Sequence, residues 1–383
     1  FWLKGLKLKV ALFTVVLFAR SVLALTPAML SFLMLGLAWA TADMAMPEDE
    51  CAGHCALNAL QMGALKKAQV ALSDDPTDSP KVHTPEMKEL KVKAVEAAHA
   101  RANNSAIPCQ QNHSVACIID VIDDIFEVLN GTEDLSPRNF EIDASLTKLV
   151  SMCLMPQPDS VTTGVLASEQ VKQLSRPMWQ FLSKAEFEME SWWAQRFLSE
   201  AVSLEGTNEF WYRQNYQELT QLELSHLQNI GHRPQKTSDH LVFVGGGPLP
   251  FSAIEYSLQT GHVNITIVEQ NLLAAQLSRA LLKQLGFKNI HVEHAAGEQF
   301  DYNGVTHLVL AALVRNDEQV IRRAMKHAGD RSLAVIGVRS ATGLRSVLYA
   351  PLDFDMKKVG LKSTGSSPVN QRVINTLLTF EPA

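Results

Sequence analysis

A run of glycines and prolines is the part of this sequence best suited to holding a ligand. It follows the apolar stretch His240–Val244 and consists of Gly245, Gly246, Gly247, Pro248, Leu249 and Pro250. Glycines placed directly after a strand allow a tight turn and let a ligand approach the backbone closely. We therefore predict a nucleotide-type ligand at this loop, with a purely structural glycine-rich turn as the alternative.

An acid at a second position narrows the choice of ligand. Glu269 ends the apolar stretch Asn264–Val268, where a carboxylate can accept hydrogen bonds from both ribose hydroxyls. A glycine loop with such an acid is the common scheme for NAD and for S-adenosylmethionine. Pro248 and Pro250 lack the amide N–H groups that hold a pyrophosphate at a helix N-terminus. The pattern thus favours a ligand without phosphate, such as S-adenosylmethionine.

The elements that position these residues alternate between strand and helix. Strands are expected at His240–Val244, Asn264–Val268, Ile290–Glu293, His307–Leu313 and Leu333–Val338, and helices at Pro250–Thr260, Leu272–Leu285 and Glu318–Ala328. A late antiparallel strand is expected at Val373–Phe380. This alternation predicts an α/β fold with a Rossmann-like parallel sheet covered on both faces.

The chain before this sheet divides into three parts. Residues 1–44 are expected to be a hydrophobic targeting or anchor segment, and residues 45–114 are expected to be a partly disordered extension and linker. Residues 115–236 carry apolar side chains at helical spacing and no strand pattern, which predicts a helical N-terminal domain. Its helices are expected to begin at Val115 and to cover Ser145–Cys153, Ser168–Leu174, Met178–Ala201 and Phe210–Ile230. The Rossmann-like domain then takes residues 237–383.

The N-terminal segment indicates a location away from the cytosol. Val10–Ala40 is almost wholly apolar, and it can be a membrane anchor or can contain a secretory signal that begins at Met29. The apolar run Leu30–Trp39 is too short to span a bilayer, and small residues suited to cleavage follow it. We favour a targeting signal, hence the secretory pathway or an organelle, with membrane association through the N-terminus. An artefactual upstream extension would instead leave the protein cytoplasmic.

Cysteines and charge restrict the partners. The first third of the chain holds Cys51, Cys55, Cys109 and Cys117, while Cys153 stands apart. An even set near a signal sequence suggests disulfides, and without a second Cys/His pair at zinc spacing no metal site is expected. The net charge is −6 and lysines and arginines do not cluster, so no nucleic-acid partner is expected.

Four strings give the sequence a family resemblance. They are FVGGGPLPFSAI around the glycine loop, LVLAALV at Leu308–Val314, VRSATGLRSVLYAP at Val338–Pro351 and LVSMCLMP at Leu149–Pro156. They occur in the order found in nicotianamine synthases, which the chain resembles from about residue 115 to its end. The resemblance implies a class I methyltransferase-type sheet domain preceded by a helical bundle domain.

The resemblance also implies an activity. Such enzymes move 3-amino-3-carboxypropyl groups from S-adenosylmethionine, used as a substrate, to an amine and release methylthioadenosine. The product is nicotianamine or a related metal chelator, the acceptor is a small amino acid, and no metal is required. An S-adenosylmethionine-dependent methyltransferase and a non-catalytic nucleoside-binding relative are the alternatives. The oligomeric state stays open.

Site residues follow from the same resemblance. Glu190 matches the acid that takes the proton of the amine, and Tyr216 matches the tyrosine paired with it; Glu186 and Tyr212 are the fallback pair, one helical turn away. Tyr212 is also expected to contact the substrate.

Further ligand contacts are expected at the carboxyl edge of the sheet. Ala311 in the LVLAALV string is expected beside the cofactor, and Glu298 is expected at the adenine. Arg339 and Arg345 follow the fifth strand, where an arginine can bind the carboxylate of the acceptor; exposed surface cations are the alternative.

Overall fold

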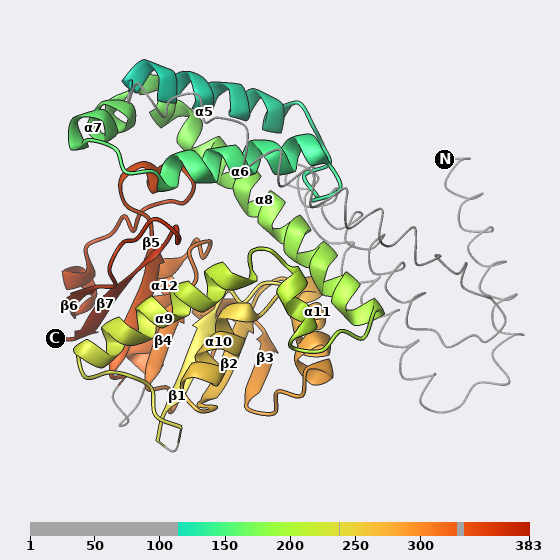
Figure 1. The fold of residues 1–383 in the computed structure, drawn as a ribbon. Coiled ribbons are helices and arrows are strands. Elements are labelled where there is room, and N and C mark those ends of the chain that lie inside the picture. The colour runs from blue at the N-terminus through green and yellow to red at the C-terminus, as the bar shows by residue number, and fades with distance from the viewer. Residues whose placement is uncertain (1–113, 237, 328–332) are drawn as a thin grey trace, which may run out of the picture. The chain divides into compact units, whose positions relative to one another are not determined.

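The computed structural model describes residues 114–236, 238–327 and 333–383 (Figure 1). All the described residues belong to one compact unit, Ser79–Ala383. The predictions for residues 1–44 and, apart from Ser114, for the linker of residues 45–114 lie outside the described residues. Within the described ranges, no helix is both long enough and apolar enough to cross a membrane.

Three helices form the first part of the described chain: α5 (Val115–Asn130), α6 (Phe140–Leu154) and α7 (Asp159–Ala167). Helix α5 begins where the side chain of Ser114 accepts a hydrogen bond from the Cys117 amide, which satisfies one free donor of the first turn. Its apolar residues recur at helical spacing and are buried, as predicted. Helix α7 was not expected from the sequence.

Helix α8 (Glu169–Ser199) is a single helix of 31 residues, so the prediction of two helices was wrong. Pro177 lies inside it. A proline within a helix removes one backbone hydrogen bond but does not always end it, because packing can offset that loss. The Trp179 indole donates to the Ser346 carbonyl (2.9 Å), and the Gln284 amide donates to the Phe197 carbonyl (3.0 Å). These two hydrogen bonds link α8 to later parts of the chain.

A seven-stranded sheet follows, in the order β3-β2-β1-β4-β5-β7-β6. Its strands are β1 (His240–Val244), β2 (Asn264–Glu269), β3 (Ile290–His294), β4 (His307–Leu310), β5 (Val335–Ser340), β6 (Leu361–Ser366) and β7 (Thr376–Pro382). The first five are parallel, and β7 runs antiparallel to β5 and β6. This arrangement confirms the predicted Rossmann-like fold; β6 was missed, and β4 ends earlier than expected.

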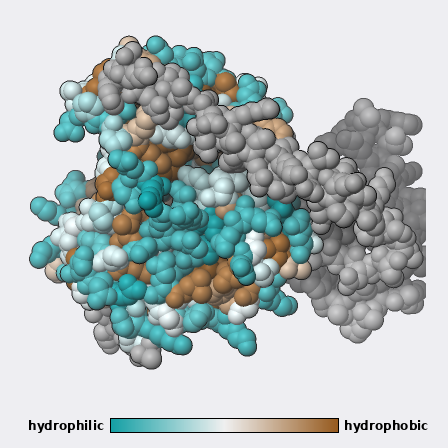
Figure 2. All heavy atoms as spheres, viewed as in Figure 1, coloured by the Kyte–Doolittle hydropathy of each residue, from teal (hydrophilic) through white to brown (hydrophobic). Residues whose placement is uncertain are grey.

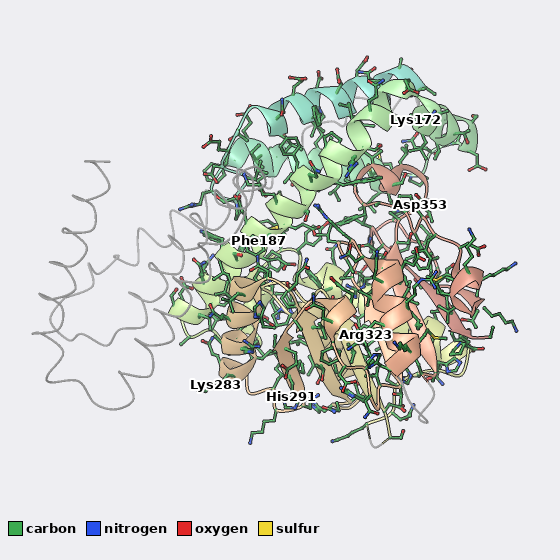
Figure 3. The ribbon with its side chains drawn as sticks, turned by 180° about the vertical axis from the view of Figure 1, so that it is seen from behind. Lys172, Phe187, Lys283, His291, Arg323 and Asp353 are labelled. Atoms are coloured by element: carbon green, nitrogen blue, oxygen red, sulfur yellow. The ribbon has the colours of Figure 1, made fainter. Side chains whose placement is uncertain are left out.

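Helices cover both faces of the sheet. They are α9 (Arg213–Asn229), α10 (Phe251–Gln259), α11 (Leu272–Gln284) and α12 (Asp317–His327), with short 3-10 turns η1 (Gly206–Glu209), η2 (Gly297–Gln299), η3 (Gly343–Val347) and η4 (Met356–Val359). Figures 1 and 3 show α9 and α10 on one face and α12 on the other. The outward side of α9 is mainly hydrophilic in Figure 2.

The two parts share a core. Residues that follow β5, among them Leu344, Val347 and Tyr349, pack into the same apolar cluster as the buried side chains of α5, α6 and α8. Helix α9, in turn, packs on α10 although the sequence groups it with the helical domain. The boundary predicted between residues 236 and 237 thus divides the chain by sequence, whereas side chains from both sides of it pack together.

The cysteine predictions are covered only in part. Cys117 is disulfide-bonded, and Cys51, Cys55 and Cys109 lie outside the described residues. Cys153 is a free, buried thiol, and burial raises its pKa to about 12, so it stays protonated at neutral pH.

Candidate active site

The glycine loop between β1 and α10 needs each of its three glycines. Gly245 and Gly247 have positive φ angles of 83° and 66°, a region that side chains disfavour. Gly246 has no room for a side chain, because a Cβ there would lie 2.3 Å from Cγ2 of Ile267. The loop is thus a tight, close-packed turn at the carboxyl end of β1, as the sequence predicted.

Glu269 holds this loop in place. One carboxylate oxygen accepts the amide N–H of Gly247 (2.9 Å) and the other accepts that of Asn271 (2.8 Å), at the start of α11. Each carboxylate oxygen has a further lone pair. Glu269 can therefore anchor the loop and still has lone pairs for both ribose hydroxyls, so the role predicted for it stays compatible with the structure.

Glu190 of α8 lies directly against the same loop. Its Oε1 accepts the hydroxyl of Tyr216 at 2.6 Å, and it accepts a backbone hydrogen bond from Leu249. A Cβ built on Gly247 would lie 2.4 Å from Oε2 of Glu190. The structure thus brings together the acid, the tyrosine and the loop that the sequence pairs only by resemblance.

This contact changes what the loop can bind. The Leu249 amide is used by Glu190, the Gly247 amide is used by Glu269, and the prolines on either side of Leu249 have no amide N–H. A pyrophosphate needs several free amides at a helix N-terminus. The geometry therefore agrees with a ligand that carries no phosphate.

The surroundings of Glu190 suit a general base. Burial raises the pKa of its carboxyl to about 7, the nearby charge of Glu269 acts in the same direction, and the hydrogen bonds from Tyr216 and Leu249 act against both. A base is most effective when its pKa lies close to the working pH. Glu190 is therefore able to accept a proton at neutral pH and to release it again.

Helix α9 positions Tyr216 through ion pairs on either side of it. Arg213, Tyr216 and Glu223 follow helical spacing on one face. Arg213 forms an ion pair with Glu255 of α10, and Glu223 forms one with Arg339 of β5. All four charged side chains are almost completely buried. They fix α9, and with it the Tyr216 hydroxyl, on the sheet domain.

Arg339 is occupied within this framework. Its Nε and Nη2 donate to the two carboxylate oxygens of Glu223 (2.8 and 2.9 Å), and its Nη1 donates to the Ser252 hydroxyl (2.8 Å). The guanidinium also lies 5.0 Å from the centre of the Phe243 ring. Three of the five N–H donors of Arg339 are thus engaged in buried hydrogen bonds within the protein, and its contact with the acceptor stays a prediction.

A stability prediction follows for Arg339. Arg339→Leu leaves the Glu223 carboxylate, which is 0% exposed, without its cation, so we expect unfolding to become easier by about 3–5 kcal/mol. Arg322→Leu is the matched control, because its ion pair with Glu318 is exposed and is worth about 1 kcal/mol or less. Urea denaturation measures both, and equal losses would contradict the prediction.

Arg345 lies in a different hollow. It is on η3, its Nη2 donates to the Asn370 carbonyl (2.7 Å), and its Nε is buried without a hydrogen-bond partner among the described residues. It lines a hollow of about 270 Å³ together with residues 153–157, at the end of α6 and directly after it. The residues lining it do not include Glu190 or the glycine loop, so a role at the acceptor stays a prediction.

The other predicted residues lie at the carboxyl edge of the sheet. Ala311 donates its amide to the Val244 carbonyl (3.0 Å), and its Cβ would lie 3.2 Å from a Cβ on Gly245. Glu298 is half-buried on η2, just after β3. Both positions suit contact with a nucleoside held by the loop.

One acid and one tyrosine of the site, Glu223 and Tyr349, had no firm signal in the sequence. Glu223 reads as one acid among many on an amphipathic helix. Tyr349 lies in the VRSATGLRSVLYAP string but was assigned no role; its hydroxyl donates to the Glu186 carboxylate. Tyr212, predicted to contact substrate, has its ring 6.5 Å from that of Tyr216. Burial raises the pKa of its hydroxyl, and the charge of Glu186 raises it further.

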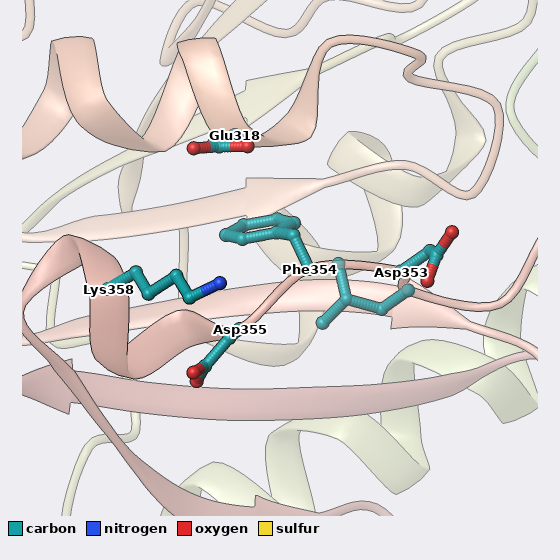
Figure 4. A pocket seen from close by; sticks show the side chains of 6 residues that line it. Glu318, Asp353, Phe354, Asp355 and Lys358 are labelled. Atoms are coloured by element: carbon teal, nitrogen blue, oxygen red, sulfur yellow. The ribbon is translucent and has the colours of Figure 1, made fainter.

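A larger hollow lies elsewhere on the surface. Figure 4 shows this space of about 550 Å³, lined by Glu318, Leu352, Asp353, Phe354, Asp355 and Lys358. Its walls come from the start of α12 and the segment before η4. None of the predicted site residues lines it, so it is separate from the chemistry at Glu190.

The fold and the site define a class. A sheet of order 3-2-1-4-5-7-6 with a glycine loop after β1 and an acid ending β2 is the class I methyltransferase type of nucleoside-binding protein. The family model "Nicotianamine synthase protein" matches residues 109–381. The chain belongs to the nicotianamine synthase family.

Relatives and solved structures agree with this membership. The chain is 28% identical over 285 residues to probable nicotianamine synthase 2 of Hordeum vulgare, covering 70% of this chain and 81% of that protein. It is 28% identical to nicotianamine synthase 2 of Oryza sativa subsp. japonica, covering 71% and 85%. MtNAS in complex with MTA and tNA has the same fold, with a TM-score of 0.59 and 23% identity over 69% of this chain and 97% of that one.

Proposed function

We propose that this protein transfers 3-amino-3-carboxypropyl groups from S-adenosylmethionine to an amine acceptor, making nicotianamine or a related metal chelator. One observation carries the proposal. The Glu190 carboxyl is held by Tyr216 and Leu249 in direct contact with the Gly247 turn. A nucleoside at that turn would have a base of suitable pKa beside its side chain.

The chemistry needs little beyond positioning and a base. An ammonium has no lone pair, so the ionised Glu190 first takes one proton from it. The amine then attacks the γ-carbon of the methionyl side chain, and the carbon–sulfur bond breaks with its electron pair passing to sulfur. The sulfonium becomes a neutral thioether, methylthioadenosine, and Glu190 later returns its proton to solvent. The positive sulfur is already a good leaving group, and the protein has to align the γ-carbon with the nitrogen.

Product analysis tests the proposal. The full chain is incubated with S-adenosylmethionine, with and without candidate amino acids, and the products are identified by mass spectrometry. We expect methylthioadenosine together with an acceptor that has gained aminocarboxypropyl units. S-adenosylhomocysteine would show a methyltransferase instead, and binding without either product would show a non-catalytic relative.

The activity should depend on pH through Glu190. Only the carboxylate can take the proton, so kcat/KM is expected to rise as the pH increases through about 7, the pKa to which burial raises this group. The Tyr216 hydroxyl stabilises the ionised form. Tyr216→Phe is therefore expected to move the acidic limb of the pH profile to higher pH. An unchanged limb in this variant would contradict the assignment of the limb to Glu190.

We also propose that residues 1–44 direct the protein to the secretory route or attach it to a membrane. The support is the apolar run Val10–Ala40. A fluorescent protein fused to residues 1–60 is expected to reach the endoplasmic reticulum, an organelle or a membrane. Even cytosolic fluorescence would contradict this proposal and leave the catalytic one untouched.

A further inference from the structure

A second carboxyl lies beside the proposed base. Glu186 precedes Glu190 by four residues on α8, so the two side chains share one face of the helix and their Cα atoms are separated by about 6 Å along the axis. The charge of Glu190 contributes to raising the pKa of Glu186, which shows that the two groups interact. Phe187, the residue directly after Glu186, is labelled in Figure 3 and lies on the part of α8 beside the sheet domain.

Each carboxyl has its own tyrosine. Tyr216 donates to Glu190, and Tyr349, just after η3, donates to Glu186. Tyr212 lies one turn before Tyr216 on α9, with the two rings 6.5 Å apart, and both tyrosines respond to the charge of Glu186. The site therefore presents two carboxyl–phenol pairs in succession, not one.

The surroundings of the two carboxyls favour positively charged ligands. Burial raises the pKa of Glu186 to about 8 and that of Glu190 to about 7, so at neutral pH the pair retains a proton. Two neighbouring carboxylates in a partly buried site ionise together only when cations enter beside them. An ammonium placed at each carboxyl would supply that charge.

The spacing matches the chemistry of a growing product. A nitrogen that has gained an aminocarboxypropyl unit is followed, three carbons further on, by the amine of that unit, at about 5 Å in an extended chain. This repeat is close to the turn of about 5.4 Å that separates successive positions on one helix face. We propose that Glu186 and Tyr349 form a second ammonium subsite, which holds the neighbouring amine of the growing product while Glu190 deprotonates the reacting one.

This inference rests on the proposed function and gives the two carboxyls different tasks. A first transfer, onto an acceptor with one amine, requires only Glu190. Every later transfer places two amines in the site and requires both carboxyls. Glu186 is thus a residue that determines how many units the enzyme adds.

The test compares product distributions. Glu186→Gln keeps the shape of the side chain and cannot ionise. In the full chain supplied with S-adenosylmethionine and the acceptor that the wild type uses, we expect the first transfer to persist and products with more units to fall by about tenfold, as for the loss of one charge-assisted hydrogen bond. Glu188→Gln is the matched control, because Glu188 pairs with Lys184 (3.7 Å). It should leave the distribution unchanged.

Each outcome decides between the two claims. If Glu186→Gln releases methylthioadenosine and its product distribution is unchanged, the second subsite is overturned and the proposed function stands. A wild type that adds a single unit has the same meaning. Loss of the first transfer as well would show that Glu186 acts in every cycle, which also overturns it. If Glu186→Gln does not fold, Tyr349→Phe replaces it, because it removes only the hydroxyl that Glu186 accepts; a distribution shifted to shorter products supports the subsite and an unchanged one overturns it. Wild type without methylthioadenosine would overturn the proposed function itself.

Discussion

Glu190→Gln should lower the kcat of methylthioadenosine release by about 10²–10⁴-fold, the contribution of a positioned general base. Glutamine has the same shape and can keep the hydrogen bonds from Tyr216 and Leu249, but it cannot take a proton. The acceptor then stays an ammonium without a lone pair. Chromatography of the nucleoside products in a single-turnover reaction measures the loss directly.

Stability measurements separate this loss from misfolding. The folded-state pKa of Glu190 is raised from 4.5 to about 7. The protonated group therefore contributes its full stabilisation below about pH 4.5. This stabilisation falls as the pH rises and is lost above pH 7. The cost is at most roughly 3 kcal/mol. Glu190→Gln should therefore match the wild type in urea denaturation at low pH and exceed it at pH 8. A variant that is folded and fully active would remove Glu190 from the mechanism.

The sheet domain could be predicted because its signals are local. Most of the parallel strands are short apolar runs, buried on both faces, between residues typical of turns, as in Asn264–Glu269. The loop at Gly245 and the acid Glu269 have positions fixed by the strands they follow, so a correct strand order brings them together. The pairing of Gly247 with Glu269 then needs no information from the rest of the chain.

The contacts between the helical part and the sheet were less predictable. Glu190 and Tyr216 are 26 residues apart and meet only because α8 and α9 both pack on the sheet domain. Arg339 is a second example: nothing in the sequence near it indicates that two of its donors bind a buried acid 116 residues earlier. Such pairings depend on tertiary packing, and neither periodicity nor local spacing records them.

Pro177 shows a similar limit. A proline is the strongest local sign of a helix end, so the sequence predicts a break before Met178. The packing of α8 against α5 on one side and against the sheet domain on the other outweighs the single missing hydrogen bond.

Gly247→Ala is expected to reduce kcat by about 100-fold, the loss that a displacement of about 1 Å can cause at a reacting group. The added Cβ would lie 2.4 Å from Oε2 of Glu190, so either the carboxyl or the loop has to move. A moved carboxyl no longer faces the nucleoside, and a moved loop loses the hydrogen bond from Gly247 to Glu269. Steady-state release of methylthioadenosine gives kcat and KM separately.

Gly261→Ala supplies the matched control, because the two changes impose the same strain in different surroundings. Gly261 has a φ of 69°, close to the 66° of Gly247, and a Cβ there meets nothing within 4 Å. Both variants should lose about 1 kcal/mol of folding stability from the left-handed backbone. Only Gly247→Ala should lose activity, because only there does the new methyl group occupy the space between the glycine loop and Glu190. Equal activities in the two variants would mean that the contact between this loop and Glu190 has no part in the reaction.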